Sequence, residues 1–246
     1  MMKKEKKKPM FFRFLQSIAK SFTTKYTFDI KEELKKDGCI IISNHAQMGG
    51  PLAYQLYYPR KKKIWCIGEM FDKKEFPDYA MKDFWPNKKK SRWFYKGLSK
   101  TLAPLSQYIF KYTDTIPVYK DTRYYTTAKQ SIKAMTEGND IIIMPEEHVP
   151  FNNIVNEFLQ NFVSVAQLYH AKTKKTVYFY PSYVAPKCKK VIIGTPIEFN
   201  PDNDFNMEKK RICEYLKEEI TKLAYTLPPH TVVPYENISK KQYPHT

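Results

Sequence analysis

Hydrophobic and polar positions follow each other in blocks that predict both strands and helices. Short β-branched runs bounded by glycine or polar residues predict strands at residues 39–42, 63–68, 115–119, 140–144, 176–184 and 190–194. Apolar residues at three- and four-residue spacing predict helices at residues 9–22, 52–58, 91–112, 122–137, 154–172 and 207–224. Pro104 is expected to interrupt the third helix, and residues 145–153 are expected to form a polar loop. The alternation of the two patterns predicts a single α/β domain with a largely parallel sheet flanked by helices.

The two ends of the chain differ from this pattern. Residues 9–22 form an amphipathic helix in a lysine-rich setting, and its apolar side suits either an anionic membrane surface or the core of the domain itself. Prolines and lysines after Leu227 favour an extended surface segment. The expected organisation is therefore a basic amphipathic segment (1–30), an α/β domain (31–226) and an extended C-terminal tail (227–246).

The strongly basic composition favours anionic partners. The chain has 42 Lys and Arg against 25 Asp and Glu, a formal net charge of +17, which favours an anionic partner. Nucleic acid is not expected, because no binding motif is present and the lysines are scattered over predicted turns. No apolar run reaches the ~20 residues that span a bilayer, and the four cysteines show no C-x-x-C pairing. We expect a cytoplasmic protein, peripheral on the inner face of the membrane.

Ionisable side chains follow two of the predicted strands. Asn44 and His45 come after residues 39–42 and lead into Gly49, Gly50 and Pro51. The strand at residues 140–144 is followed by Glu146, Glu147 and His148. The carboxyl ends of parallel strands meet at one edge of a sheet, where ligands bind. A His beside a carboxylate suits general base catalysis, and His148 is a candidate second base or a His that only bonds its own loop.

A third strand end carries cations. Lys120 and Arg123 follow the run at residues 115–119. Such a pair is suited to holding a phosphate. Together the three strand ends predict acyl transfer to an alcohol on an anionic substrate, with His45 removing the hydroxyl proton.

The order and spacing of these blocks resemble the glycerophospholipid acyltransferases typified by 1-acylglycerol-3-phosphate acyltransferase. The blocks are Asn44-His45, Ile116-Pro117-Val118-Tyr119-Lys120, Met144-Pro145-Glu146, Tyr180-Pro181 and Ile193-Gly194-Thr195-Pro196-Ile197. The resemblance covers residues 38–200. It implies transfer of a fatty acyl group from acyl-CoA or acyl-carrier protein to a hydroxyl of a lysophospholipid or glycerol-phosphate-like acceptor, at a phospholipid membrane surface. No bound cofactor or metal is expected, because the thioester is already activated.

The resemblance also assigns roles and shows departures. It implies catalytic roles for His45, Glu146 and Glu147, and substrate binding by Asn44, Gly50, Lys120, Arg123 and His148. Gly50 stands where the family has the Asp that orients the His; Lys120 replaces an Arg, and Glu147-His148 replace Gly-Thr. Either another carboxylate replaces that Asp, with Glu146 and Glu147 preferred over Glu69, or the chain is a catalytically lapsed, lipid-binding or regulatory relative.

Overall fold

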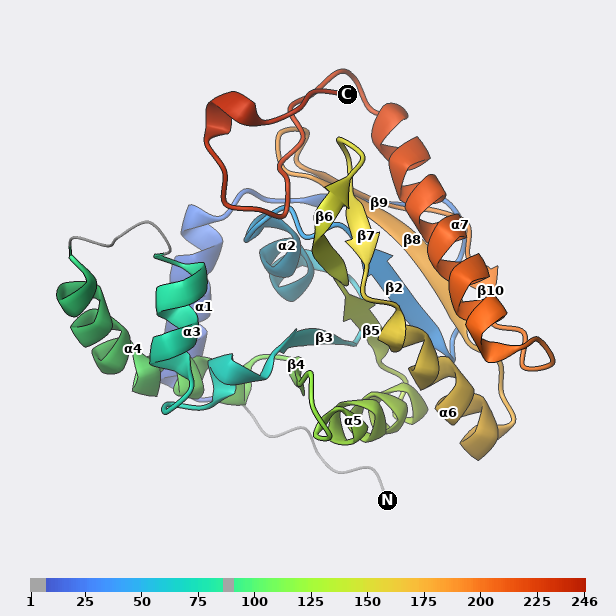
Figure 1. The fold of residues 1–246 in the computed structure, drawn as a ribbon, viewed down its shortest axis with the longest axis horizontal. Coiled ribbons are helices and arrows are strands. Elements are labelled where there is room, and N and C mark those ends of the chain that lie inside the picture. Colours follow the sequence, from blue (N-terminus) through green and yellow to red (C-terminus); the bar gives the residue numbers. More distant parts are fainter. Residues whose placement is uncertain (1–7, 86–90) are drawn as a thin grey trace. The chain divides into compact units, whose positions relative to one another are not determined.

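The computed structural model describes residues 8–85 and 91–246, with the side chain of His148 outside that description (Figure 1). Its residues form two compact units. The smaller unit contains the chain up to Thr23 together with Cys66–Tyr124, and the larger unit contains Thr24–Trp65 and Tyr125–Thr246. The segments expected from the sequence, 1–30, 31–226 and 227–246, remain predictions.

A largely parallel sheet forms the centre of the larger unit, as the sequence predicts. Its strands are β1 (Thr27–Ile30), β2 (Cys39–Ser43), β3 (Lys62–Ile67), β5 (Asp140–Ile143), β8 (Tyr178–Ala185), β9 (Lys190–Ile193) and β10 (Ile197–Glu198). The spatial order is β1-β9-β8-β2-β5-β3, with β10 antiparallel to β8. The pairings of β2 with β5 and β8, of β3 with β5, and of β1 with β9 are parallel, whereas β8 and β9 are antiparallel. Strand β2 is therefore central.

Helices cover both faces of this sheet. They are α2 (Gly49–Tyr57), α5 (Tyr124–Thr136), α6 (Ser164–Thr173) and α7 (Phe205–Tyr225). On one face the hydroxyl of Tyr54 in α2 donates to Ser182 Oγ of β8 at 2.6 Å. On the other face α7 packs along β8 (Figure 1). There the Phe162 ring contacts the Phe179 ring. Burial on both faces explains why every residue of β2 is buried and why its sequence is a continuous apolar run.

The structure corrects the predictions for residues 145–172. The expected loop is the hairpin of β6 (Glu146–Phe151) and β7 (Asn156–Phe158), and the expected helix begins only at η2 (Gln160–Val163) and α6. Asn152 Oδ1 accepts the backbone N–H groups of Ile154 and Val155, and Asn153 has a φ of 72°. These bonds turn the chain back, so an apolar spacing that resembles a helix becomes a strand.

The smaller unit is mostly helical. It contains α1 (Met10–Phe22), η1 (Gly68–Phe71), α3 (Phe76–Asp83), α4 (Arg92–Tyr112) and β4 (Thr115–Val118). Helix α1 agrees with the sequence prediction, whereas α3 is not predicted. Pro104 lies inside α4 without ending it, contrary to the expected interruption. Phe76, Ala80 and Ala103 pack α3 against α4. Within the described residues no helix combines the length and apolar character needed to cross a bilayer.

The segment after α7 folds back on itself. Thr231 and His245 form an isolated antiparallel bridge, and Val232 N–H donates to the Pro244 carbonyl at 2.8 Å. Val232 is fully buried. Residues 231–245 therefore form a closed loop in the larger unit, hereafter the C-terminal loop.

Candidate functional site

The loop after β2 has a strained backbone. Ala46 and Gln47 have φ angles of 46° and 52°, a left-handed conformation that costs ~1–2 kcal/mol for each non-glycine residue. The turn is closed by Gly49 N–H, which donates to the Ala46 carbonyl at 2.9 Å, and by Gly50 N–H, which donates to the His45 carbonyl at 3.0 Å. Strain of this kind persists only where the surroundings fix the conformation, and it is concentrated at functional sites.

The strained turn orients the His45 ring. The Gln47 carbonyl oxygen lies 2.6 Å from His45 Nδ1. A carbonyl can only accept a hydrogen bond, so Nδ1 carries the proton and Nε2 is the basic atom of the neutral ring. The ring is half-buried, and the Tyr235 ring lies 5.1 Å from it, centroid to centroid. This geometry sets the tautomer that a general base needs.

Glu146 supports the main chain of this loop. Its Oε2 accepts the His45 backbone N–H at 2.5 Å, and its Oε1 accepts the Asn156 backbone N–H at 3.0 Å. The side chain is only 6% exposed. Burial, and to a smaller extent the charge of Glu236, raise the pKa of Glu146 to about 7 against the two backbone hydrogen bonds that lower it. The structure thus brings Glu146 to His45, but to its backbone N–H, whereas the imidazole Nδ1 bonds the Gln47 carbonyl.

Gly50 is packed against the backbone of the same loop. A Cβ at this position would lie 2.5 Å from the His45 carbonyl oxygen and 3.1 Å from that of Asn44. Backbone atoms cannot move aside as a flexible side chain can, so an Asp does not fit here without rearranging the turn. The Gln47 carbonyl occupies the position at Nδ1 that an orienting carboxylate would take.

Asn44 links two neighbouring strands. Its Nδ2 donates to the Val184 carbonyl at 3.1 Å, and its Oδ1 accepts the Val184 N–H at 2.7 Å. The residue is 1% exposed. Its amide therefore fixes the end of β2 against β8, and the substrate contact predicted for it stays a prediction.

Two of the other predicted residues, Glu147 and His148, follow Glu146 on β6. Glu147 follows the buried Glu146 on β6 and is exposed, as expected where successive side chains point to opposite faces. The side chain of His148 lies outside the described residues, so its predicted role is not addressed. Glu69 belongs to η1 of the smaller unit.

Lys120 and Arg123 lie in the smaller unit. Arg123 Nη2 pairs with Asp121 Oδ2 at 2.8 Å and Nη1 with Glu75 Oε1 at 3.4 Å. Its guanidinium stacks 4.0 Å from the centre of the Tyr119 ring. Lys120 is exposed. Phosphate binding by these two cations stays a prediction, and for Arg123 the acids already present would compete with it.

Sequence analysis missed the residues that surround the strained turn. Gln47 Nε2 donates to the Glu236 carbonyl at 3.1 Å and to the Tyr243 hydroxyl at 2.8 Å. Asn156 Nδ2 donates to Glu236 Oε1 at 2.7 Å. The polar character of Gln47 beside His45 is the only sequence signal, because the C-terminal residues that it contacts are about 190 positions away.

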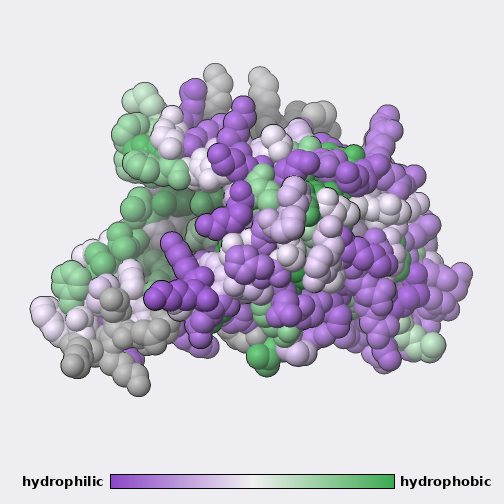
Figure 2. All heavy atoms as spheres, turned by 90° about the horizontal axis from the view of Figure 1, so that it is seen from above, coloured by the Kyte–Doolittle hydropathy of each residue, from purple (hydrophilic) through white to green (hydrophobic). Residues whose placement is uncertain are grey.

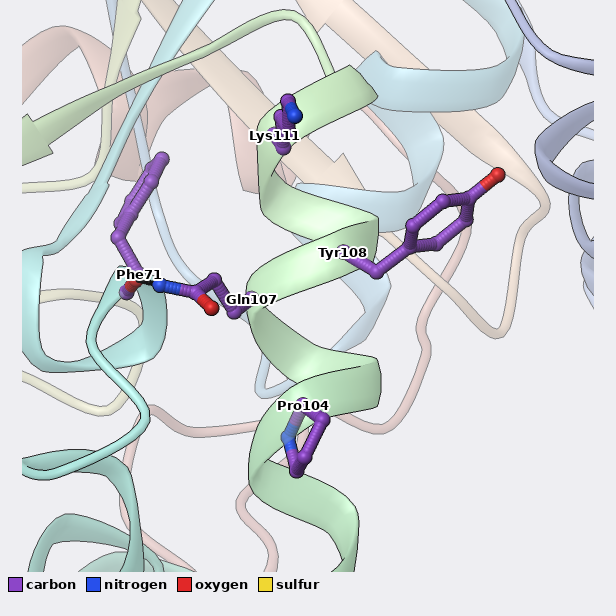
Figure 3. Close-up of a pocket in the computed structure, with 5 residues that line it drawn as sticks. All are labelled: Phe71, Pro104, Gln107, Tyr108 and Lys111. Atoms are coloured by element: carbon purple, nitrogen blue, oxygen red, sulfur yellow. Dashed lines mark hydrogen bonds between the residues drawn. The ribbon is translucent and has the colours of Figure 1, made fainter.

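A hollow in the smaller unit has a different character. It lies beside α4 and is lined by Phe71, Pro104, Gln107, Tyr108 and Lys111 (Figure 3). Gln107 points toward Phe71, and its Nε2 donates to the Phe71 carbonyl at 3.3 Å. The lining contains no carboxylate or histidine, so it offers no acid–base pair. Across the described residues, no group of His, Cys, Asp and Glu is arranged to hold a metal ion.

Comparison with known proteins finds similarity to solved structures only. No protein-family model matches the chain, and no curated protein matches it significantly. Among solved structures it is similar to the 1-acyl-sn-glycerophosphate (LPA) acyltransferase PlsC from Thermotoga maritima, with 13% identity and a TM-score of 0.48. The similarity covers 86% of this chain and 79% of that one. At this level the likeness concerns the fold and assigns no activity to this chain.

Proposed function

We propose that this protein is an acyltransferase that moves a fatty acyl group from an acyl thioester to a hydroxyl of a lysophospholipid or glycerol-phosphate-like acceptor. The observation that carries the proposal is the His45 ring at the carboxyl end of a central parallel strand, with Nδ1 held by the Gln47 carbonyl. The order of the sequence blocks that resemble glycerophospholipid acyltransferases supports the same reaction.

In the proposed mechanism, the oxygen of the acceptor hydroxyl attacks the thioester carbonyl carbon while His45 Nε2 accepts the hydroxyl proton. A carbon–oxygen bond forms and the carbon–sulfur bond breaks. The thiolate leaves and takes the proton back from the imidazolium, which restores the neutral ring. The Nδ1 hydrogen bond keeps the ring oriented while it becomes positively charged. Glu146 holds the backbone on which the ring is carried.

The donor in this proposal is acyl-CoA or acyl-carrier protein, and no bound cofactor is needed because the thioester supplies an activated acyl group. Lys120 and Arg123 are the cations that we propose for an anionic acceptor, because guanidinium and ammonium groups bind phosphate oxygens strongly. Their sequence position after β4 is the basis for this assignment.

A phospholipid membrane is the surface that we propose for the protein. Helix α1 exposes Met10, Phe11, Phe14, Ile18 and Phe22, which are 86%, 52%, 59%, 39% and 89% exposed. Figure 2 shows hydrophobic residues gathered at the left of the view, over the elements of the smaller unit. An apolar helix face with flanking cations binds the interface of an anionic bilayer, with about 1 kcal/mol from each cation near the surface. The inner face of the cytoplasmic membrane is such a surface.

Acyl transfer by purified protein tests the proposed function. The assay combines acyl-CoA or acyl-carrier protein with a panel of lysophospholipids and glycerol 3-phosphate, and measures thiol release and acylated product by mass spectrometry. His45→Ala should lower the rate by roughly 10²- to 10⁴-fold without changing the unfolding transition. His170→Ala is the matched control, because His170 Nδ1 also lies near a backbone carbonyl, that of Lys175 at 3.2 Å. Equal rates for wild type and His45→Ala would contradict the proposal.

A second function is favoured by one observation. Gly50 leaves no room for the family's Asp, which fits a lipid-binding relative that has lost catalysis. Wild-type protein that binds lysophospholipid vesicles but releases no thiol with any donor and acceptor would support this alternative.

A further inference from the structure

The C-terminal loop meets the strained turn that carries His45. Its Glu236 carbonyl and Tyr243 hydroxyl both accept from Gln47 Nε2, at 3.1 and 2.8 Å. The ring of Tyr235 lies beside the His45 ring. The side chain of Gln47, whose carbonyl orients His45, is thus held by residues from the far end of the chain.

The loop is itself anchored at both ends and at its middle. Thr246 N–H donates to the His230 carbonyl at 3.1 Å, and the bridge between Thr231 and His245 closes the loop. At the middle, Glu236 Oε1 accepts Asn156 Nδ2 at 2.7 Å. The backbone N–H of Asn156 donates to Glu146, which also accepts the backbone N–H of His45. The contacts therefore form a circuit around the turn.

We propose that the C-terminal loop is a positioning element for the catalytic histidine, with Glu236 and Tyr243 as positioning residues that act on His45 through Gln47. Left-handed Ala46 and Gln47 would relax toward ordinary backbone conformations without an outside restraint. Relaxation would turn the Gln47 carbonyl away from Nδ1, and the ring would lose its fixed tautomer. The inference rests on the proposed function for its catalytic meaning, whereas the effect on the ring is independent of any reaction.

The first test measures the ring directly. Heteronuclear NMR of the imidazole nitrogens, assigned with His45→Gln, gives the tautomer of His45 in the full-length protein without substrate. Wild type should show the Nδ1–H form. Glu236→Ala removes the anchor to Asn156, and Tyr243→Phe removes one acceptor of Gln47, so both should shift His45 toward a mixture of tautomers. Glu236→Gln keeps an acceptor oxygen and should shift it less than Glu236→Ala.

The second test measures catalysis by the same variants. Glu236→Ala should lower kcat by about 10-fold or more with KM changed less than about 2-fold, by analogy with groups that orient metal-bound histidines, whose loss costs roughly 10- to 100-fold. Tyr215→Phe is the matched control for Tyr243→Phe. Tyr215 lies on α7, and its hydroxyl donates to the Thr195 carbonyl at 3.1 Å, so this variant loses one tyrosine hydrogen bond elsewhere in the larger unit.

The outcomes separate the two proposals. A wild-type protein with the Nδ1–H tautomer but no acyl transfer would overturn the proposed function and leave the positioning role. Folded Glu236→Ala and Tyr243→Phe proteins with an unchanged His45 tautomer and unchanged kcat would overturn the positioning role. If Glu236→Ala does not fold, as judged by its unfolding transition, Tyr243→Phe decides the matter alone, since it removes a single hydroxyl.

Discussion

Replacing Glu146 by Gln should flatten the pH dependence of the stability of this protein. Glu146 is buried, and burial raises its pKa to about 7. A carboxyl group that holds its proton more tightly in the folded state favours folding most below its ordinary pKa, and that contribution is lost as the pH rises toward 7. Gln cannot ionise, so the variant should lack this change.

The magnitude follows from the two pKa values. The interval between the ordinary value of 4.5 and the folded value of about 7 corresponds to about 3 kcal/mol of unfolding free energy, at ~1.4 kcal/mol for each pH unit. Gln also leaves an NH₂ group facing one of the two backbone N–H donors, which costs ~1–3 kcal/mol at every pH. The useful quantity is therefore the difference between wild type and variant as a function of pH, in which this constant offset cancels.

Urea unfolding at a series of pH values between about 5 and about 8 measures that difference. Relative to Glu146→Gln, wild type should lose about 2.5 kcal/mol across this range, because part of the change occurs below pH 5. The ionisable neighbours Glu236 and His45 are present in both proteins. Tyr183, whose pKa is raised by burial and by Glu146, titrates well above this pH range. Glu147→Gln is the matched control, because Glu147 is exposed on the same strand and should leave the curve of wild type unchanged.

Parallel curves for wild type and Glu146→Gln would refute the reasoning. They would mean that Glu146 ionises at its ordinary pKa, and hence that water or a cation reaches the carboxylate. A wild type that gains stability over the same range relative to the variant would refute it more strongly, because the sign would then be that of a carboxylate stabilised by folding.

Three further predictions concern other parts of the chain. Gly50→Ala should destabilise the fold by about 1–3 kcal/mol in urea unfolding, because the new Cβ would lie 2.5 Å from the His45 carbonyl oxygen. Gly97→Ala is the control and should be neutral or stabilising, because a Cβ there has no atom within 4 Å. Equal effects of the two substitutions would contradict the packing at Gly50. Lys120→Ala and Arg123→Ala should each raise KM more for a phosphate-bearing acceptor than for a neutral one, and identical losses on both would remove the phosphate role. Phe14→Glu should weaken flotation with anionic vesicles, and added salt should weaken it in wild type; equal wild-type flotation with neutral vesicles would count against the membrane proposal.

The strands of the central sheet were predictable because buried strands have a continuous apolar sequence that can be recognised locally. The predicted strands at residues 39–42 and 140–144 each contain three consecutive isoleucines, and the structure places these isoleucines in β2 and β5, where they are buried. The hairpin of β6 and β7 was not predictable in the same way. Its direction depends on the Asn152 side chain bonding two backbone N–H groups, which competes with the helical spacing of the apolar residues around it.

The candidate site, like the fold, was predictable in part. The topology of parallel strands predicts that the residues after β2 and β5 meet at one edge, and Glu146 does reach His45. The chemical form of that contact was not predictable, because the carboxylate bonds a backbone N–H. The direction of the Gln47 carbonyl depends on two left-handed φ angles, and these depend on contacts with a segment about 190 residues away. Tertiary contacts of that range leave no periodic signal in the sequence.

The exchange of an orienting carboxylate for a backbone carbonyl has a definite chemical consequence. A carboxylate beside a histidine fixes the tautomer and also stabilises the positive charge that the ring gains in the transition state. In a serine protease, the substitution that gives the wrong tautomer lowers kcat by roughly 10⁴-fold. Here the Gln47 carbonyl supplies the correct tautomer through a 2.6 Å hydrogen bond, so that loss is avoided. A neutral carbonyl gives the imidazolium less electrostatic stabilisation than a full negative charge would. The buried carboxyl group of Glu146 is bound to the His45 main chain, and with a pKa raised to about 7 by burial it is only partly ionised near neutral pH. In the proposed mechanism the site therefore orients a base whose positive charge is weakly stabilised, and the rate of acyl transfer should depend more on how firmly the turn is held than on the carboxylates around it.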